Sequence, residues 1–323
     1  MADKKILLEA RDLVKEFALE GGKKGKNVVH AVSGVNLRIY EGETLALVGE
    51  SGCGKSTLGR TLIKLIEATS GTIEFDGTDI TRMKDREFTE IRRQMQIIFQ
   101  DPYASLNPRM NVREIISEPL TTHGLARTKD EIESQVKALM DEVGIPREFI
   151  NRYPHQFSGG QRQRIGIARA IALHPRLIIC DEPVSALDVS IQAQIINLLA
   201  QLQRELELTV LFISHDLRVV RHITHRVMVM YLGSNVEVGP TEAIFQHPAH
   251  PYTQVLTKAA PKLDPLNRQR DYAIEGEPPS PIHTPTGCKF HPRCPYCTDK
   301  CRSEVPELKE IAPGHLCACH YPL

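Results

Sequence analysis

Residues 49–57 match the pattern G-x-x-x-x-G-K-[ST], and we call them the phosphate loop. The glycines let the backbone wrap closely with its N–H groups pointing inward, so that phosphate oxygens meet donors without side-chain bulk. Lys55 would reach the β- and γ-phosphate oxygens of a nucleotide, and Ser56 would offer its hydroxyl to Mg2+. The alternative is a plain glycine-rich turn. The predicted nucleotide contacts are Gly49, Glu50, Ser51, Gly52, Cys53, Gly54, Lys55, Ser56 and Thr57.

Two carboxylates follow an apolar run further along the chain. Residues 177–180 predict a buried strand, and Asp181 and Glu182 come directly after it. Asp181 is placed to serve Mg2+, and Glu182 can polarise an attacking water, with Pro183 limiting how far its carboxylate swings. The alternative is a strand-end turn that carries two solvated acids. If residues 49–57 do bind phosphate, a strand ending beside them would bring the acids to the nucleotide.

Apolar patterns predict the elements that carry these groups. Residues 44–48 form an apolar strand before the phosphate loop, and residues 57–66 have helical apolar spacing after it. Further strands are expected at 95–99 and 209–214, where the polar residues Gln100 and His215 follow. Alternating strands and helices of this kind predict an α/β fold.

A second helix start offers donors to an anion. Ser158, Gly159 and Gly160 precede a helical pattern at 161–173, so that backbone N–H groups and a hydroxyl meet at a helix N-terminus. Between Gln100 and this helix, residues 111–120 and 128–143 predict a small helical insert.

The order of these motifs resembles an ATP-binding-cassette (ABC) ATPase, the nucleotide-binding subunit of a membrane transporter, over residues 6 to about 245. Residues 247–253, 276–281 and the cysteine-rich end from 287 resemble the dipeptide/oligopeptide importer branch, closest to the second ATPase subunit of the dipeptide systems. The resemblance implies a P-loop NTPase core with an antiparallel β subdomain and a helical insert at about 101–165. These make up an ATPase domain over 1–245, followed by an extension over 246–323.

The resemblance also implies roles for single residues. Gln100 would touch the Mg2+ shell or the attacking water, and His215 would hold Glu182 and that water in line. Phe17 would stack on adenine. A histidine at a strand end is otherwise an ordinary satisfied polar residue. Phe17 could instead be a core aromatic, because a Gly/Lys-rich insertion at 20–27 separates it from the next strand.

In the family, the second helix start serves the nucleotide of a facing subunit, so that two ATP molecules hold a head-to-tail pair together. The residues implied in this contact are Ser158, Gly159, Gly160, Gln161 and Asp188. The implied partners are a related but different ATPase subunit, two membrane permeases that dock on the helical insert and on residues 101–108, and, indirectly, an external peptide-binding protein. A homodimer stays open.

Cysteines gather at the end of the chain, at 288, 294, 297, 301, 317 and 319. So many thiols in a chain without a predicted secretion signal favour a metal site over disulfides, and their spacing suits zinc or iron–sulfur. The importer resemblance implies a [4Fe-4S] cluster held by Cys288, Cys294, Cys301 and Cys319. Cys297 and Cys317 depart from that pattern, and zinc or unligated thiols stay open. Cys53 and Cys180 are expected to be buried fillers.

Bulk properties agree with a transport ATPase. Forty basic and forty acidic residues cancel, which disfavours a nucleic-acid partner. No signal segment or membrane-spanning run is recognisable, so any membrane role must depend on partner subunits. The resemblance implies a peripheral protein on the cytoplasmic face of the inner membrane. Cargo stays open between peptides and nickel or another small solute. The motifs are also compatible with a soluble ABC ATPase and with a nucleotide-binding regulator that lacks turnover.

Overall fold

The computed structural model describes residues 5–19, 28–259 and 276–323, so the predicted insertion at 20–27 lies outside the described part. The chain forms two compact units, one made of residues 1–82 and 213–323 and the other of residues 83–212. No helix in the described ranges is both long enough and apolar enough to cross a bilayer.

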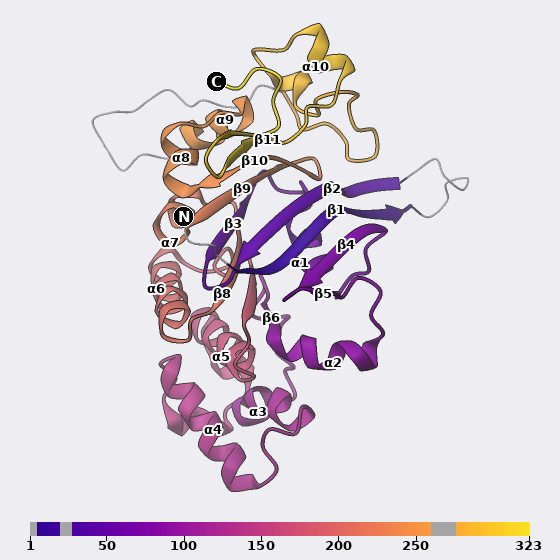
Figure 1. The fold of residues 1–323 in the computed structure, drawn as a ribbon. Coiled ribbons are helices and arrows are strands. Elements are labelled where there is room, and N and C mark those ends of the chain that lie inside the picture. The colour runs from indigo at the N-terminus through magenta and orange to yellow at the C-terminus, as the bar shows by residue number, and fades with distance from the viewer. Residues whose placement is uncertain (1–4, 20–27, 260–275) are drawn as a thin grey trace. The chain divides into compact units, whose positions relative to one another are not determined.

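The first unit contains an antiparallel sheet in the order β2-β1-β4-β5, with its strands drawn side by side in Figure 1. Ala10 of β1 lies opposite Leu37 of β2 on one side and Ile73 of β4 on the other. All three side chains are buried, so this sheet packs one face on a core. The strands are β1 (Ile6–Ala18), β2 (Val28–Tyr40), β4 (Ser70–Phe75) and β5 (Thr78–Asp79).

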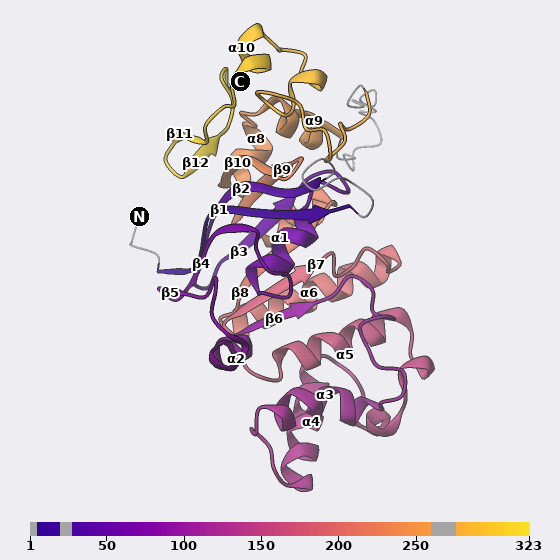
Figure 2. The same ribbon diagram turned by 90° about the vertical axis from the view of Figure 1, so that its right-hand side faces the viewer.

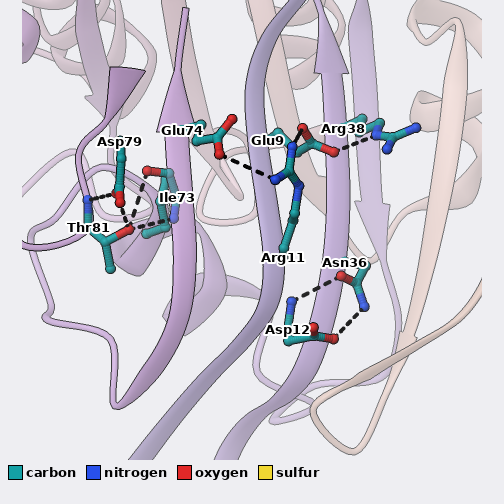
Figure 3. A network of polar contacts seen from close by, with 9 residues as sticks. All are labelled: Glu9, Arg11, Asp12, Asn36, Arg38, Ile73, Glu74, Asp79 and Thr81. Atoms are coloured by element: carbon teal, nitrogen blue, oxygen red, sulfur yellow. Dashed lines mark hydrogen bonds and ion pairs between the residues drawn. The ribbon is translucent and has the colours of Figure 1, made fainter. Parts of the chain in front are cut away.

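Polar side chains tie neighbouring strands of this sheet together (Figure 3). The Glu9 carboxylate accepts hydrogen bonds from Arg11 and Arg38, each at 2.6 Å, and these bonds, that of Arg11 foremost, hold the pKa of Glu9 below its usual value. Asp12 and Asn36 exchange two hydrogen bonds, at 3.0 and 3.1 Å, between β1 and β2. The Glu9–Arg38 and Asp12–Asn36 pairs connect β1 to β2 and support the pairing of these two strands.

A second sheet of the first unit runs in the order β11-β12-β10-β9-β3. β3 and β9 are parallel, with Val48 opposite Val229, and every residue of β3 is buried, as expected for a parallel strand covered on both faces. The strands are β3 (Thr44–Val48), β9 (Arg226–Tyr231), β10 (Ser234–Pro240), β11 (Lys309–Ala312) and β12 (His315–Cys317). The helices of this unit are α1 (Lys55–Leu62), α7 (Leu217–Ile223), α8 (Thr241–Gln246), α9 (Pro251–Ala259), α10 (Asp299–Ser303) and the 3-10 turn η3 (His291–Arg293).

The helix after the phosphate loop is shorter than the predicted 57–66. It ends at Leu62 because Lys64 adopts a left-handed backbone with φ of +55°, and Leu65, just beyond, is 53% exposed. The apolar spacing at 62–66 therefore indicated helix where the chain already turns.

The second unit carries a parallel strand pair, β6 next to β7, with β8 on the other side of β7. Its strands are β6 (Met95–Ile98), β7 (Leu177–Asp181) and β8 (Thr209–Ser214), which ends past the unit boundary. Its helices are α2 (Asp85–Gln94), α3 (Val112–Thr122), α4 (Lys129–Glu142), α5 (Gly159–Ile171) and α6 (Val189–Glu205), with 3-10 turns η1 (Arg147–Asn151) and η2 (Pro154–Gln156).

Helices α3, α4 and α5 lie side by side in both views (Figures 1 and 2). Asn111, Thr128 and Ser158 each accept a hydrogen bond from a backbone N–H in the first turn of their helix, so all three helix starts carry side-chain caps. The starts predicted at Asn111 and Thr128 are confirmed, whereas α5 begins two residues before the predicted 161.

Residues 101–108 are fastened to α5. Arg169 donates to the Ser105 carbonyl at 2.8 Å, and the Arg162 guanidinium lies 4.0 Å from the centre of the Tyr103 ring. Tyr103 is 58% exposed, but Leu106 is only 2% exposed. Leu106 is thus a core residue of the second unit, and the expectation that it forms part of a docking surface on this segment does not hold for its side chain.

Candidate functional site

The phosphate loop connects β3 to α1, as predicted. Gly54 has φ of +102°, and a Cβ there would collide with the carbonyl oxygen of Ala31. A Cβ on Gly49 would collide with the carbonyl oxygen of Met230. The close approach of neighbouring strands therefore requires glycine at both positions, and the loop backbone is left free of side chains.

Lys55 is 4% exposed, and its ammonium group is turned back onto the loop. Its Nζ donates to the Gly49 carbonyl at 2.8 Å and to the Glu50 carbonyl at 3.0 Å. These carbonyls keep a buried positive charge next to the N-terminus of α1, where phosphate oxygens would bind. Cys53 is 5% exposed, and burial raises the pKa of its thiol, as expected for a filler.

In the second unit, Gln100 and Glu182 meet. β6 and β7 are parallel with Ile98 opposite Cys180, so the residues that follow the two strands emerge at the same edge of the sheet. Gln100 Nε2 donates to Glu182 Oε2 at 3.2 Å. An amide and a carboxylate in contact can both bind one water and orient it toward a phosphorus atom.

The two acids at the end of β7 differ in environment. Asp181 is fully buried as the last residue of the strand, whereas Glu182 follows with φ of +47°. A left-handed backbone is uncommon for a residue other than glycine and is found at functional sites. The turn directs Glu182 out of the strand toward Gln100. Beside Asp181, burial raises the pKa of the Cys180 thiol to about 12, so Cys180 remains a protonated filler.

The first turn of α5 is capped by hydrogen bonds between its own residues. Ser158 Oγ accepts from the Gln161 N–H at 3.3 Å, and Gln161 Oε1 accepts from the Ser158 N–H at 3.1 Å. Gly159 packs near Leu187, and a Cβ on Gly160 would collide with the Ile191 side chain. The helix starts of α5 and α6 are therefore neighbours, and Gly160 sets how closely they approach.

This packing gives a stability prediction. Replacing Gly160 by alanine is expected to lower the free energy of unfolding by about 1–3 kcal/mol, because the added methyl overlaps Ile191. Gly166→Ala in the same helix meets nothing within 4 Å and is expected to raise it by about 0.5–1 kcal/mol. Urea unfolding of both variants measures the difference, and equal effects would contradict the packing argument.

Three further predicted residues, Phe17, His215 and Asp188, are exposed. Phe17, at the end of β1, is 38% exposed, with Lys15 Nζ 4.9 Å from the centre of its ring, so the core alternative is wrong. His215, just after β8, is exposed. Asp188, at the start of α6, is exposed and makes no capping hydrogen bond, and its neighbour Val189 is 80% exposed. Glu182, Gln100, the start of α5 and Asp188 belong to the second unit, whereas the phosphate loop, Phe17 and His215 belong to the first.

The cysteine-rich end surrounds a cavity of about 20 Å3. Four of its six cysteines line this cavity, and they are Cys288, Cys294, Cys301 and Cys319. Backbone contacts hold their segments together, since the Cys288 N–H donates to the Cys301 carbonyl at 2.8 Å. Cys297 lies outside the cavity with its thiol near the Thr298 carbonyl, and Cys317 is buried opposite Glu237 of β10.

Burial and neighbouring sulfurs act on the thiols around this cavity. Burial is the largest cause that raises the pKa of Cys288, to about 11, and the neighbouring sulfurs add to it. The pKa values of Cys294 and Cys319 are raised for the same reasons. A cation is what would stabilise thiolates in such a place. Among the described residues, however, no three His, Cys, Asp or Glu side chains are arranged to hold a single metal ion.

Two residues that contact the phosphate loop were not predicted from the sequence. Tyr252 and Arg293 both contact Glu50, from segments that the sequence marked only as family features. Tyr252 lies in the predicted segment 247–253, and Arg293 stands between two cavity cysteines. Neither Tyr252 nor Arg293 belongs to a motif whose spacing relates it to the phosphate loop. Their contacts with Glu50 therefore could not be predicted from the sequence.

Comparison with known proteins agrees with this geometry. Residues 32–185 match the family model described as ABC transporter, and residues 236–301 match the one described as oligopeptide/dipeptide transporter, C-terminal region. The oligopeptide transport ATP-binding protein OppF of Salmonella typhimurium is 53% identical over 95% of this chain and 93% of its own length. The oligopeptide transport ATP-binding protein AppF of Bacillus subtilis is 51% identical over 99% and 98%.

Solved structures resemble the fold. The dimeric ATP-binding cassette MJ0796, in a post-hydrolysis state bound to ADP and Pi, has a TM-score of 0.66 and 30% identity over 73% of this chain and 99% of its own. CbiO1 of Clostridium perfringens, part of an ABC transporter complex, has a TM-score of 0.65 and 28% identity over 76% and 92%. The chain is an ATPase that belongs to the ABC transporter family, in the group of oligopeptide transport ATP-binding proteins. The predicted family, fold class and enzyme class are thereby confirmed.

Proposed function

We propose that this chain hydrolyses MgATP to power the import of short peptides through a membrane permease. The observation that carries this proposal is the similarity to oligopeptide transport ATP-binding proteins, which extends through the C-terminal region. The chemistry agrees, because a phosphate loop with a buried lysine and a carboxylate paired with Gln100 are the parts that ATP hydrolysis needs.

Transport in reconstituted vesicles tests this function. The chain is assembled with two candidate permeases and a related ATPase subunit, and uptake of a labelled tripeptide is measured with and without ATP on the side of the membrane that carries the ATPases. ATP-dependent uptake is expected, together with ATP hydrolysis that the peptide and its binding protein stimulate. Uptake of nickel in place of peptide would reassign the cargo, and ATP hydrolysis without any uptake would contradict a transport role.

We further propose that two ATPase subunits, this chain and a related one, close head to tail over two nucleotides. The start of α5 and the adjacent start of α6 would face the partner's nucleotide, through Ser158, Gly159, Gly160, Gln161 and Asp188. An exposed Asp188 beside a strongly exposed Val189 supports this surface as an interface. In this arrangement Phe17 would stack on adenine, Ser56, Gln100 and Asp181 would serve Mg2+, and His215 would align the attacking water with Glu182.

The assembly would sit on the cytoplasmic face of the inner membrane. There the insert at about 101–165 and the exposed Tyr103 would meet the permeases. Residues 1–245 would form the ATPase domain, and residues 246–323 the extension characteristic of peptide importers.

We propose that the cavity in the extension holds a [4Fe-4S] cluster on Cys288, Cys294, Cys301 and Cys319. The support is that these four thiols, and neither Cys297 nor Cys317, line one cavity. The cluster would supply cross-links to a segment that is rich in proline and poor in apolar core.

Iron analysis tests the cluster. Protein purified without oxygen is expected to contain iron and acid-labile sulfide in equal amounts, and Cys294→Ser is expected to lose most of both. Cys297→Ser is the matched control, because this thiol lies in the same segment but outside the cavity, and it should keep its iron. Zinc without sulfide would assign a zinc site instead, and a metal-free protein would contradict both.

A further inference from the structure

One residue of the phosphate loop, Glu50, is held by the C-terminal extension from two directions. The Glu50 N–H donates to the hydroxyl of Tyr252 at 2.9 Å. Its carboxylate accepts two hydrogen bonds from the Arg293 guanidinium, from Nη1 at 2.9 Å and from Nη2 at 3.1 Å. A bidentate arginine–carboxylate pair fixes the orientation of the carboxylate as well as its distance from the arginine. All three residues belong to the first unit.

Both holding groups are themselves immobilised. Tyr252 is fully buried, with its ring centre 4.7 Å from that of Tyr231 and 5.3 Å from that of Phe290. The Arg293 side chain is 6% exposed and also lies 3.4 Å from the Tyr231 hydroxyl. Because their rotamers are locked by packing, these two side chains can position Glu50 rather than follow it.

The contacts leave Glu50 with little freedom. Its N–H and its carboxylate are engaged by the extension, and its carbonyl accepts from Lys55, the residue expected to bind phosphate. The second residue of the phosphate loop therefore connects the extension to the lysine. A shift of Glu50 would move the carbonyl that holds Lys55 and the N–H groups that follow in the loop.

We propose that Arg293 and Tyr252 are positioning residues of the nucleotide site, so that the C-terminal extension sets the shape of the phosphate loop. The inference rests on the proposed binding of MgATP at this loop. Arg293 has a second effect, because it neutralises a carboxylate close to the place where the nucleotide's phosphates would bind. Without it, Glu50 presents an uncompensated negative charge to a polyanion.

The charge effect gives a test that a merely structural role would not pass. Arg293→Met removes the guanidinium but keeps an apolar stem, and it is expected to raise the Kd and KM for MgATP roughly tenfold, as for loss of one charged hydrogen-bonded pair. The kcat should change less than threefold. Adding Glu50→Gln removes the unpaired charge, and the double variant is expected to bind MgATP about threefold more tightly than Arg293→Met, because the charge effect is relieved while the positioning contact is still missing.

Isothermal titration with MgATP and steady-state hydrolysis by the assembled transporter measure these changes. Arg302→Met is the matched control, because Arg302 is an exposed arginine of the same extension, and it should leave Kd unchanged. Tyr252→Phe removes only the hydroxyl that accepts from Glu50 and is expected to raise Kd about threefold to fivefold. Thermal unfolding shows whether each variant is folded.

A Kd for Arg293→Met within twofold of wild type would overturn the proposal. A double variant as weak as the single one would assign the whole loss of affinity to the missing positioning contact and none of it to charge. If Arg293→Met does not fold, Arg293→Lys is used instead, because lysine keeps the positive charge but cannot make both hydrogen bonds to Glu50. Its Kd for MgATP should lie between that of wild type and the tenfold higher value expected for Arg293→Met. A Kd equal to that of wild type would count against the proposal. Failure of the ATPase assignment is distinguishable, because then wild type would neither bind nor hydrolyse MgATP.

Discussion

Glu182→Gln is expected to lower kcat for ATP hydrolysis by a factor on the order of 10²–10⁴, while MgATP still binds. Glutamine keeps the size of the side chain and can still contact Gln100, which now lies 3.2 Å from the carboxylate. What it lacks is the negative charge that polarises the attacking water. Hydrolysis measured at saturating MgATP gives kcat, and titration of the nucleotide gives Kd.

The same variant tests the head-to-tail pair. With hydrolysis blocked, bound ATP should keep the two subunits together, so that size-exclusion chromatography shows a dimer with ATP and its loss with ADP. Glu207→Gln is the matched control, because Glu207 is an exposed glutamate of the second unit that also has a left-handed backbone, with φ of +50°. Unchanged turnover in Glu182→Gln would favour a nucleotide-binding regulator, and a monomer at saturating ATP would contradict the pairing.

Lys55→Met is expected to weaken MgATP binding about 10²–10³-fold, since truncating one partner of a buried charge pair costs about 3–4 kcal/mol. The ammonium group is buried and already bound to two loop carbonyls, at 2.8 and 3.0 Å, so it is in place for phosphate before the nucleotide arrives. Methionine fills the same space without charge. Titration with MgATP measures the loss.

A surface lysine provides the comparison for this variant. Lys129 is exposed in the first turn of α4, and Lys129→Met should bind MgATP like wild type. Thermal unfolding of Lys55→Met should show a folded protein, because the loop glycines and Tyr252 still hold the backbone. A Kd within tenfold of wild type in a folded variant would show that the loop does not bind phosphate through this lysine.

The extension after residue 246 both carries cysteines and contacts the phosphate loop. It carries the cysteine cavity, and the same short segment, between Cys288 and Cys294, contributes Arg293 to the phosphate loop. The Arg293 and Glu50 variants separate an effect of these contacts on nucleotide binding from an effect on stability.

Much of the site could be read from the sequence because its motifs are local. The phosphate loop, the acids after β7 and the start of α5 each depend on contacts within a few residues, such as the reciprocal hydrogen bonds of Ser158 and Gln161. Glycine patterns and helix caps encode such geometry directly. The same holds for the helix starts at Asn111 and Thr128. Local patterns failed where a backbone turn intervened, as at Lys64, which ends α1 early.

Tertiary structure alone decided which distant residues meet. Gln100 contacts Glu182 because β6 and β7 are parallel and in register, and Arg293 reaches Glu50 across 243 residues because the aromatic cluster of Tyr231, Tyr252 and Phe290 packs the extension on the loop. Strand register and core packing depend on the whole chain, so no spacing rule predicts them. The same physics buried Leu106, and it gathered around one cavity the four cysteines that the importer resemblance had already implied.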